Sequence, residues 1–356
     1  MKQLRQALHE SGYMQFYLFF GEMNLRYRDW AVAAAGMKAP LRLLVSLFLL
    51  GEAVPASQAM KLVGEEATKD LVSARILKAE GGTLQSNSYH LLVHRGLFYF
   101  CQVINEPVAY LGEDSVALGQ YQTPLWNSKV LDLCSGPGIQ AMYAAQRGNR
   151  VTAVEQRRET CDIQRVNLRI NHLEDRVELV NATASEFAGA RTGRWDQILF
   201  NPPLVPIPGK MQVPSVRHGG HDGLELVGEI LESYAGRLEA GGCFEFVGMS
   251  LLKGKGTRVQ SPLLELARKR RLAGRVHLLS RHEIGGNSVV FAMHAASYAQ
   301  SEAISPQTAR AQLSVEYAGF RNFFLYYACL HERSAREKQV IEIVDMSATH
   351  YGGWFS

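Results

Sequence analysis

The sequence feature that most constrains the fold is a strand, a tight glycine turn and a helix in direct succession. Apolar residues from Val130 to Leu133 predict a buried strand, and Gly136 and Gly138 follow it just before a helical pattern that begins at Ile139. Glycine adopts backbone conformations that a Cβ forbids, and it lets a ligand come close to the main chain. We therefore expect an α/β fold in which this turn binds a ligand at the carboxyl end of a strand.

The chain after residue 128 alternates short apolar runs with amphipathic helices, which is typical of a parallel sheet covered on both faces. We predict a doubly wound, Rossmann-like domain of seven strands. The predicted strands are 129–133, 150–154, 177–180, 197–200, 243–248, 275–280 and 288–294.

Residues 1–105 are predicted to form a separate helical, winged-helix-like domain, because three helical patterns precede two strand-like runs. Ser57 is expected to cap the second helix. The expected elements are helices over 41–50, 57–64 and 65–77 and strands over 89–93 and 97–103. Acidic residues offset the basic ones in the third helix, so we expect this domain to hold substrate or to dimerise rather than to read DNA.

The remaining domain boundaries follow from the change of pattern on either side of the sheet. The sheet domain is predicted over 106–300, and 301–356 form a C-terminal extension. Aromatic residues at helical spacing from Phe320 to Leu330 predict a helix there, which would pack on the core or at a dimer interface.

Charge and cysteine content argue against several classes of protein. The 38 basic and 34 acidic residues of this 356-residue chain give a net charge of +4, which is too weak a signal for a nucleic-acid partner. The 5 cysteines form no CxxC pair, so we expect reduced thiols and no metal site. Apolar runs are too short for a membrane span, and we expect a cytoplasmic protein.

An acidic residue after the second strand points to a nucleoside cofactor. Glu155 is placed to accept hydrogen bonds from both hydroxyls of a ribose. The turn also satisfies a dinucleotide GxGxxA pattern, but Pro137 removes an N–H group that a pyrophosphate would use. Asp132 would repel a pyrophosphate and attract an ammonium group. This balance favours S-adenosylmethionine over a dinucleotide.

The fourth predicted strand runs directly into Asn201-Pro202-Pro203-Leu204. This tetrapeptide should therefore lie at the same edge of the sheet as the glycine turn. The prolines fix the backbone, so that the Asn201 side-chain oxygen and the Pro202 carbonyl can accept N–H groups of one planar amine or amide. Methyl transfer from a sulfonium needs alignment more than acid–base groups, and we expect these two residues to align the acceptor nitrogen.

From about Tyr110 to His294 the chain resembles class I S-adenosylmethionine-dependent methyltransferases of the small-methyltransferase-domain group, which act on release-factor glutamine and on RNA base amino groups. The resemblance implies that the turn lines the methionine end of the cofactor, Glu155 binds its ribose and Asn201 with Pro202 holds the target. The residues predicted to bind the cofactor are Asp132, Cys134, Ser135, Gly136, Gly138, Glu155, Gln156, Thr183 and Asn201.

Three positions depart from the pattern of that group. Cys134 replaces a glycine, which is tolerable if its φ is negative. Thr183 stands where an aspartate often accepts from the adenine amino group. Leu204 stands where amide and base methylases carry Tyr or Phe, which leaves room for a smaller or non-planar acceptor. Tyr110, Asp114, Leu204 and His221 are predicted to contact the acceptor, with His221 a candidate base.

We therefore predict an enzyme that methylates a nitrogen of a small metabolite, a peptide-like molecule or a protein. An O-methyltransferase and an RNA base N-methyltransferase are the alternatives, and a non-catalytic S-adenosylmethionine-binding partner protein is the non-enzyme alternative. The glycine pattern by itself is also typical of a dehydrogenase that uses NAD. A homodimer is left open.

Overall fold

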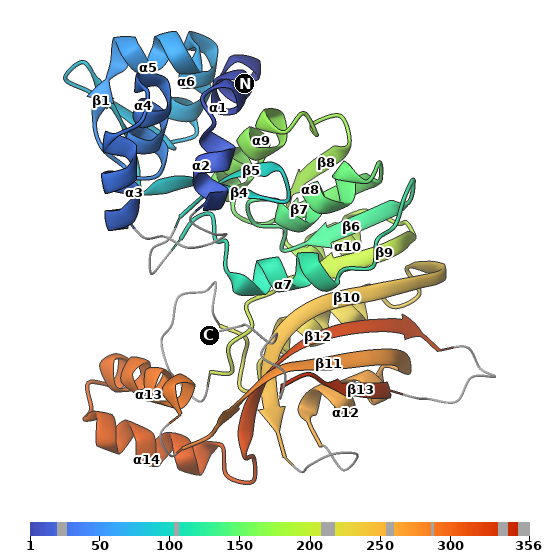
Figure 1. Ribbon diagram of the computed structural model, residues 1–356. Coiled ribbons are helices and arrows are strands. Elements are labelled where there is room, and N and C mark those ends of the chain that lie inside the picture. Colours follow the sequence, from blue (N-terminus) through green and yellow to red (C-terminus); the bar gives the residue numbers. More distant parts are fainter. Residues whose placement is uncertain are drawn as a thin grey trace. The chain divides into compact units, whose positions relative to one another are not determined.

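The computed structural model describes residues 1–19, 27–102, 107–207, 218–253, 260–285, 288–333 and 341–347. The chain divides into two compact units (Figure 1). The first unit comprises Met1–Leu111 and Ser135–Ala182, and the second comprises Gly112–Cys134 and Thr183–Ser356. The chain passes from one unit to the other within the predicted glycine turn. No helix among the described residues combines the length and the apolar character that a membrane crossing requires.

The first unit contains helices and three sets of paired strands. Its helices are α1 (Lys2–Glu10), α2 (Tyr13–Phe19), α3 (Tyr27–Ala35), α4 (Ala39–Phe48), α5 (Ala56–Val63), α6 (Glu65–Ser73), α8 (Ile139–Gln146) and α9 (Arg158–Ile170). Its strands are β1 (Val54–Pro55), β2 (Leu77–Glu80), β3 (Thr83–Ser86), β4 (Tyr89–His94), β5 (Leu97–Gln102), β7 (Arg150–Glu155) and β8 (Val177–Asn181). Strands β1, β3 and β2 form an antiparallel sheet, β4 pairs with β5, and β7 runs parallel to β8.

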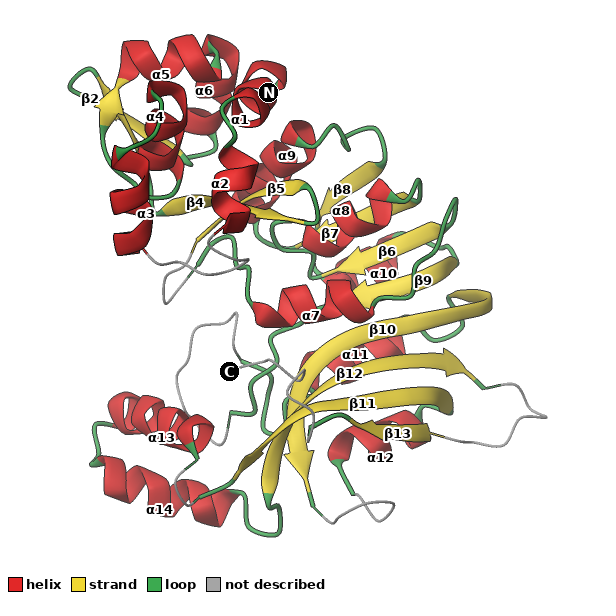
Figure 2. Cartoon of the chain, in the orientation of Figure 1, coloured by secondary structure: helices red, strands yellow, loops and turns green. Residues whose placement is uncertain are grey.

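The N-terminal elements differ from the prediction in several places. Helices α1, α2 and α3 and strand β1 were not predicted. The third predicted helix was too long, because α6 ends at Ser73 and the chain then forms a hairpin of β2 and β3 (Figure 2). Gly81 and Gly82 make its two-residue turn with φ of +56° and +78°, values that favour glycine. Ser57 does not cap α5, which begins after Pro55 without a side-chain cap. The predicted strands at 89–93 and 97–103 are present as a separate pair, although Val103 lies outside the described residues. A winged-helix-like assignment for this part of the chain stays a prediction.

The second unit is built on a mixed sheet. Its strands are β6 (Lys129–Leu133), β9 (Trp195–Phe200), β10 (Leu238–Leu252), β11 (Leu272–Glu283), β12 (Asn322–Glu332) and β13 (Ile341–Asp345). Their order is β13-β11-β12-β10-β9-β6, and only the two pairs that include β12 are antiparallel. Its helices are α7 (Glu113–Tyr121), α10 (Ala184–Ala190), α11 (Glu225–Ser233), α12 (Pro262–Lys269), α13 (Val289–Glu302) and α14 (Pro306–Glu316). The mixed α/β class is thereby confirmed, and six of the seven predicted strands are present.

The seventh predicted strand, at 288–294, was wrong. This segment begins helix α13, because the Ser288 hydroxyl accepts a hydrogen bond from the Phe291 N–H at 3.3 Å and so caps the helix. Phe291, His294 and Ala295 are then buried at helical spacing. The apolar run of 288–294 is therefore one face of a helix.

The predicted helix over Phe320–Leu330 was also wrong, because most of it forms strand β12. This strand lies between β10 and β11 and pairs with both. Phe323 to Tyr327 are buried without alternation, as expected for a strand covered on both faces. When every residue of a run is buried and apolar, some of its aromatic residues also fall at helical spacing. Periodicity therefore could not distinguish a helix from a strand here.

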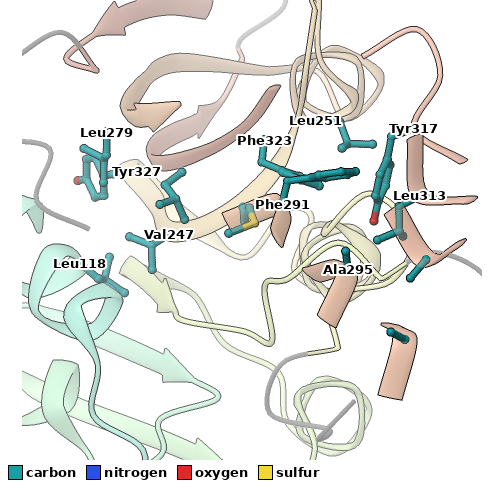
Figure 3. Packing of buried hydrophobic residues seen from close by; sticks show 14 residues of the cluster. Leu118, Val247, Leu251, Leu279, Phe291, Ala295, Leu313, Tyr317, Phe323 and Tyr327 are labelled. Carbon is teal, nitrogen blue, oxygen red and sulfur yellow. The ribbon is translucent and has the colours of Figure 1, made fainter. Parts of the chain in front are cut away.

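A hydrophobic cluster of the second unit joins β10, β11 and β12 to α7, α13 and α14 (Figure 3). Phe323 points into this cluster and is fully buried, and its ring packs edge-on against Tyr317 with centroids 5.2 Å apart. Removal of an aromatic ring from such a site leaves a cavity that the surroundings fill only partly.

We expect Phe323→Ala to lower the free energy of unfolding by about 3–5 kcal/mol, measured by denaturant titration. Val315→Ala on α14 is the control, because Val315 is 75% exposed, and it should change stability by less than about 0.5 kcal/mol. Equal stabilities for the two variants would contradict the packing described for β12.

Candidate cofactor and acceptor sites

In the first unit, Ser135–Gly138 form a closed turn that leads into α8. The Gly138 N–H donates to the Ser135 carbonyl at 2.9 Å, and the Ser135 N–H donates to the Val154 carbonyl of β7 at 3.1 Å. Gly136 and Gly138 have φ of +54° and +91°, so both adopt the left-handed conformations that favour glycine. The turn is thus held by its own backbone and by β7.

The two glycines have different surroundings. A Cβ on Gly138 would lie 2.7 Å from the Gln164 side chain, whereas a Cβ on Gly136 would meet no atom within 4 Å. Gly138 is therefore needed for packing. The backbone at Gly136 faces open space, and a ligand can approach it there.

Glu155 ends β7, and its carboxylate is tied to the turn. Its side chain accepts hydrogen bonds from the Gly136 N–H at 3.0 Å and from the Arg157 N–H at 2.8 Å. Burial raises the pKa of Glu155, although these backbone donors oppose the rise. A carboxylate has about four lone-pair sites. Glu155 therefore retains acceptor capacity toward a ribose hydroxyl, and this carboxylate fits a nucleoside cofactor.

Three amide side chains that the sequence did not single out support this turn. Asn167 of α9 donates to the Pro137 carbonyl at 3.0 Å, and Gln164 accepts from the Ser135 hydroxyl at 3.0 Å. Asn181 at the end of β8 donates to the carbonyls of Glu155 and Gln156, each at 2.9 Å. The one signal that could have found them is burial of polar residues on α9, where Gln164 and Asn167 are both fully buried.

Cys134 does not meet the condition of a negative φ, under which a cysteine would replace the glycine without strain. Its φ is +55°, in the left-handed region that costs a residue with a Cβ about 1–2 kcal/mol. The sharp exit from β6 imposes this conformation. The replacement of glycine by cysteine is therefore a source of local strain at the start of the turn.

In the second unit, Asn201 follows β9 and is held by the first turn of α7. Its Nδ2 donates to the Asp114 carboxylate at 2.6 Å and lies 3.2 Å from the Ser115 hydroxyl oxygen. Asp114 is almost fully buried. A carboxylate accepts hydrogen bonds and an ionised one cannot donate them, so the amide nitrogen must face Asp114.

With the amide nitrogen facing Asp114, the side-chain oxygen of Asn201 is available to accept a hydrogen bond. The Asn201 Oδ1 is buried and has no hydrogen-bond partner among the described residues. A buried acceptor without a partner costs about 1–3 kcal/mol. Asn201 is therefore suited to accept a hydrogen bond from an N–H group of a bound molecule. Pro202, which follows it, is buried.

A glycine-rich segment, residues 219–223, is hydrogen-bonded to the chain just after Leu204. The Gly219 N–H donates to the Val205 carbonyl at 2.9 Å. A Cβ on Gly223 would lie 2.0 Å from the Met249 carbonyl oxygen, so no side chain fits there. Leu204 packs against the hydrophobic cluster of this unit. The segment therefore fixes the backbone beside Leu204.

The remaining predicted residues have diverse positions. His221 is half-exposed, and its Nδ1 lies 3.5 Å from Glu316. Thr183 caps α10 by accepting from the Glu186 N–H, so its hydroxyl is engaged in a capping box. Asp132 is buried on β6 opposite Leu199, Tyr110 is 43% exposed, and Gln156 is exposed. The structure thus brings Ser135, Gly136, Gly138 and Glu155 together in the first unit, and Asp114 and Asn201 together in the second.

We expect Glu155→Ala to weaken S-adenosylmethionine binding at least about 100-fold in calorimetric titration, because two hydrogen bonds to a charged group are lost. Glu159→Ala is the matched control, since Glu159 is exposed and pairs with Arg75 at 3.4 Å. Binding by the wild type should also weaken as the pH falls toward the raised pKa of Glu155, since protonation removes acceptor capacity. Unchanged affinity in Glu155→Ala would contradict the assigned role.

Comparison with known proteins shows which family a part of the chain resembles. Residues 118–265 match the methyltransferase small domain. The chain is 29% identical over 181 residues to a ribosomal protein uL3 glutamine methyltransferase of Bradyrhizobium diazoefficiens, across 46% of this chain and 55% of the relative. It is 31% identical over 150 residues to the protein of the same name from Bordetella pertussis, across 39% and 49%.

A third relative is named for a different acceptor, a tRNA adenine. The tRNA1(Val) (adenine(37)-N6)-methyltransferase of Pectobacterium carotovorum is 29% identical over 99 residues, across 27% of this chain and 40% of the relative. The chain thus spans about half the length of the curated relatives it matches. These matches confirm the predicted resemblance to S-adenosylmethionine-dependent methyltransferases and the predicted cofactor.

Proposed function

We propose that this chain, whose residues 118–265 carry a methyltransferase small domain, methylates a nitrogen atom of an amide or amine. The observation that carries the proposal is the buried Asn201 Oδ1, which Asp114 orients and which has no partner among the described residues. An acceptor nitrogen with an N–H group would satisfy this oxygen. The relatives support the choice of nitrogen, because each is named for methylation of a glutamine or of an adenine N6.

The chain's own residues would act by positioning. When bound, S-adenosylmethionine would supply an activated methyl group, with a neutral thioether as the leaving group. The Asn201 Oδ1 and the Pro202 carbonyl would accept N–H bonds from the acceptor, which directs the nitrogen lone pair and stabilises the positive charge that develops on nitrogen. Asp114 is a positioning residue in this scheme, because it holds the amide of Asn201 at 2.6 Å.

The predicted cofactor residues receive their roles within the same proposal. Gly136 would let the cofactor approach the turn, and Glu155 would bind its ribose. Ser135 and Gly138 would lie at its methionine end. Thr183, Gln156, Tyr110 and His221 have weaker support, since Thr183 is engaged as a cap and His221 is beside Glu316.

For the acceptor we propose a peptide-like molecule or a protein, in keeping with the two uL3 glutamine methyltransferases. The tRNA relative gives no support to the expectation that nucleic acid is excluded, so an RNA base is the second candidate. Leu204 lacks the aromatic ring that would stack on a planar amide or base, so this position does not favour one of these two acceptors over the other. The N-terminal and C-terminal segments would select the acceptor.

We expect Asn201→Ala to lower kcat at least about 100-fold, as is typical when one aligned polar group is removed from a transition state. Asp114→Ala should give a smaller loss of kcat. Glu113→Ala is the matched control, because Glu113 is the exposed neighbour of Asp114 in α7. Full activity of Asn201→Ala would exclude nitrogen alignment by this residue.

The acceptor can be identified with S-adenosylmethionine that carries an isotope-labelled methyl group. Small molecules, proteins and RNA from cells that lack the gene are incubated with the purified chain and analysed by mass spectrometry. We expect one labelled amide or amine nitrogen in the protein or peptide fraction. A base-labile methyl ester would show oxygen transfer instead, and cofactor binding without any labelled product would favour a non-catalytic partner protein.

A further inference from the structure

A second cluster of chemically reactive side chains lies in the second unit, on the paired strands β10 and β12. Cys243, Glu245 and Cys329 place one sulfur, oxygen and sulfur atom within 4.8 Å of one another. Glu245 is fully buried, and the two cysteines are partly buried. The predicted methyl transfer makes no use of them, and no CxxC spacing points to them.

The strand register explains why the three side chains meet. Glu245 lies directly opposite Cys329 in the antiparallel pair of β10 and β12. Cys243 precedes Glu245 by two residues on the same strand, so its side chain points to the same face. The cluster is therefore set by the sheet itself, and no loop is needed to assemble it.

Glu245 is held with one oxygen toward the thiols. Its Oε2 accepts from the Tyr327 hydroxyl at 2.8 Å and from the Thr123 N–H at 2.9 Å. Its Oε1 accepts from Gln197 at 3.0 Å and lies 3.2 Å from the Cys243 sulfur and 3.9 Å from the Cys329 sulfur. Partners of this kind orient the ligands of metal sites.

The same register disfavours a disulfide between the two cysteines. Because Cys329 faces Glu245, Cys243 is its diagonal neighbour, and diagonal residues of an antiparallel pair are about 7–8 Å apart. A disulfide needs Cα atoms that are closer than about 7 Å. A cation that bridges the two sulfurs relaxes this requirement.

We propose that Cys243, Glu245 and Cys329 bind one divalent cation of the zinc type. Both sulfurs would bind it as thiolates, and Glu245 Oε1 would be the third ligand. Bonds of about 2.3 Å to sulfur and about 2.1 Å to oxygen in a tetrahedron place the sulfur and oxygen ligands ~3.6 Å apart. The distances of 3.2 and 3.9 Å bracket this value. Binding releases the two thiol protons to solvent. Soft sulfur ligands select zinc over magnesium or calcium.

The test is titration of the reduced, metal-free full chain with Co²⁺, followed by displacement with Zn²⁺. We expect one Co²⁺ per chain with a thiolate-to-cobalt charge-transfer band that Zn²⁺ abolishes. Cys243→Ser and Cys329→Ser should each lose the band, and Cys161→Ser, which changes a buried cysteine of the first unit, should keep it. Tyr327→Phe should weaken binding about 10–100-fold, because it removes one orienting hydrogen bond.

Circular dichroism of each variant shows that it is folded. Three results would overturn the proposal: a folded wild type without the band, a band that survives in the Cys243→Ser/Cys329→Ser double variant, or a Cys243–Cys329 disulfide in the unreduced protein together with no cobalt binding after reduction. The titration uses neither S-adenosylmethionine nor an acceptor. Its outcome is therefore independent of the proposed methyl transfer.

Discussion

The place of Asn201 depends on the parallel pairing of β9 with β6 on one side and with β10 on the other. Phe200 ends β9 opposite Leu133 of β6 and Phe246 of β10. The rings of Phe200 and Phe246 stack with centroids 4.5 Å apart. A strand buried on both sides cannot slip by one residue without exchanging the faces of all its side chains. Asn201 and the prolines after it therefore leave the sheet at a fixed point.

The sequence predicted those parts of the fold whose signal is local. Six strands were found because each is a short apolar run bounded by polar or glycine residues. Two of the errors, at Ser288 and at Phe323, arose where tertiary structure decides between helix and strand. Strand β12 is buried because β10 and β11 occupy both of its edges, and no window of the sequence around Phe323 contains those partners.

The same limit applies to the candidate sites. Gly136, Gly138 and Glu155 could be predicted because their roles follow from a turn and the next strand. The contact between Asp114 and Asn201 joins residues that are 87 apart, and that between Glu245 and Cys329 joins residues that are 84 apart. No metal site was predicted from the cysteines, because spacing along the chain does not show which sulfur atoms lie close together. Antiparallel pairing of strands can bring together sulfur atoms that no sequence motif connects. Thr183 was assigned by position in a family pattern, and its capping role became visible only with α10.

The bond between Asp114 and Asn201 has a consequence for what the chain would reject. Because the carboxylate fixes which way the amide points, Asn201 cannot turn round to offer an N–H to a molecule that lacks one. A carbonyl or ether analogue of the acceptor would face a buried oxygen and leave it unpaired. Sites built in this way discriminate by the penalty that they impose on the wrong molecule, and such penalties exceed what differences in size alone achieve. Selectivity would then depend on the orientation of one dipole, the side-chain amide of Asn201. Helix α7, which lies much earlier in the sequence, holds this amide through Asp114.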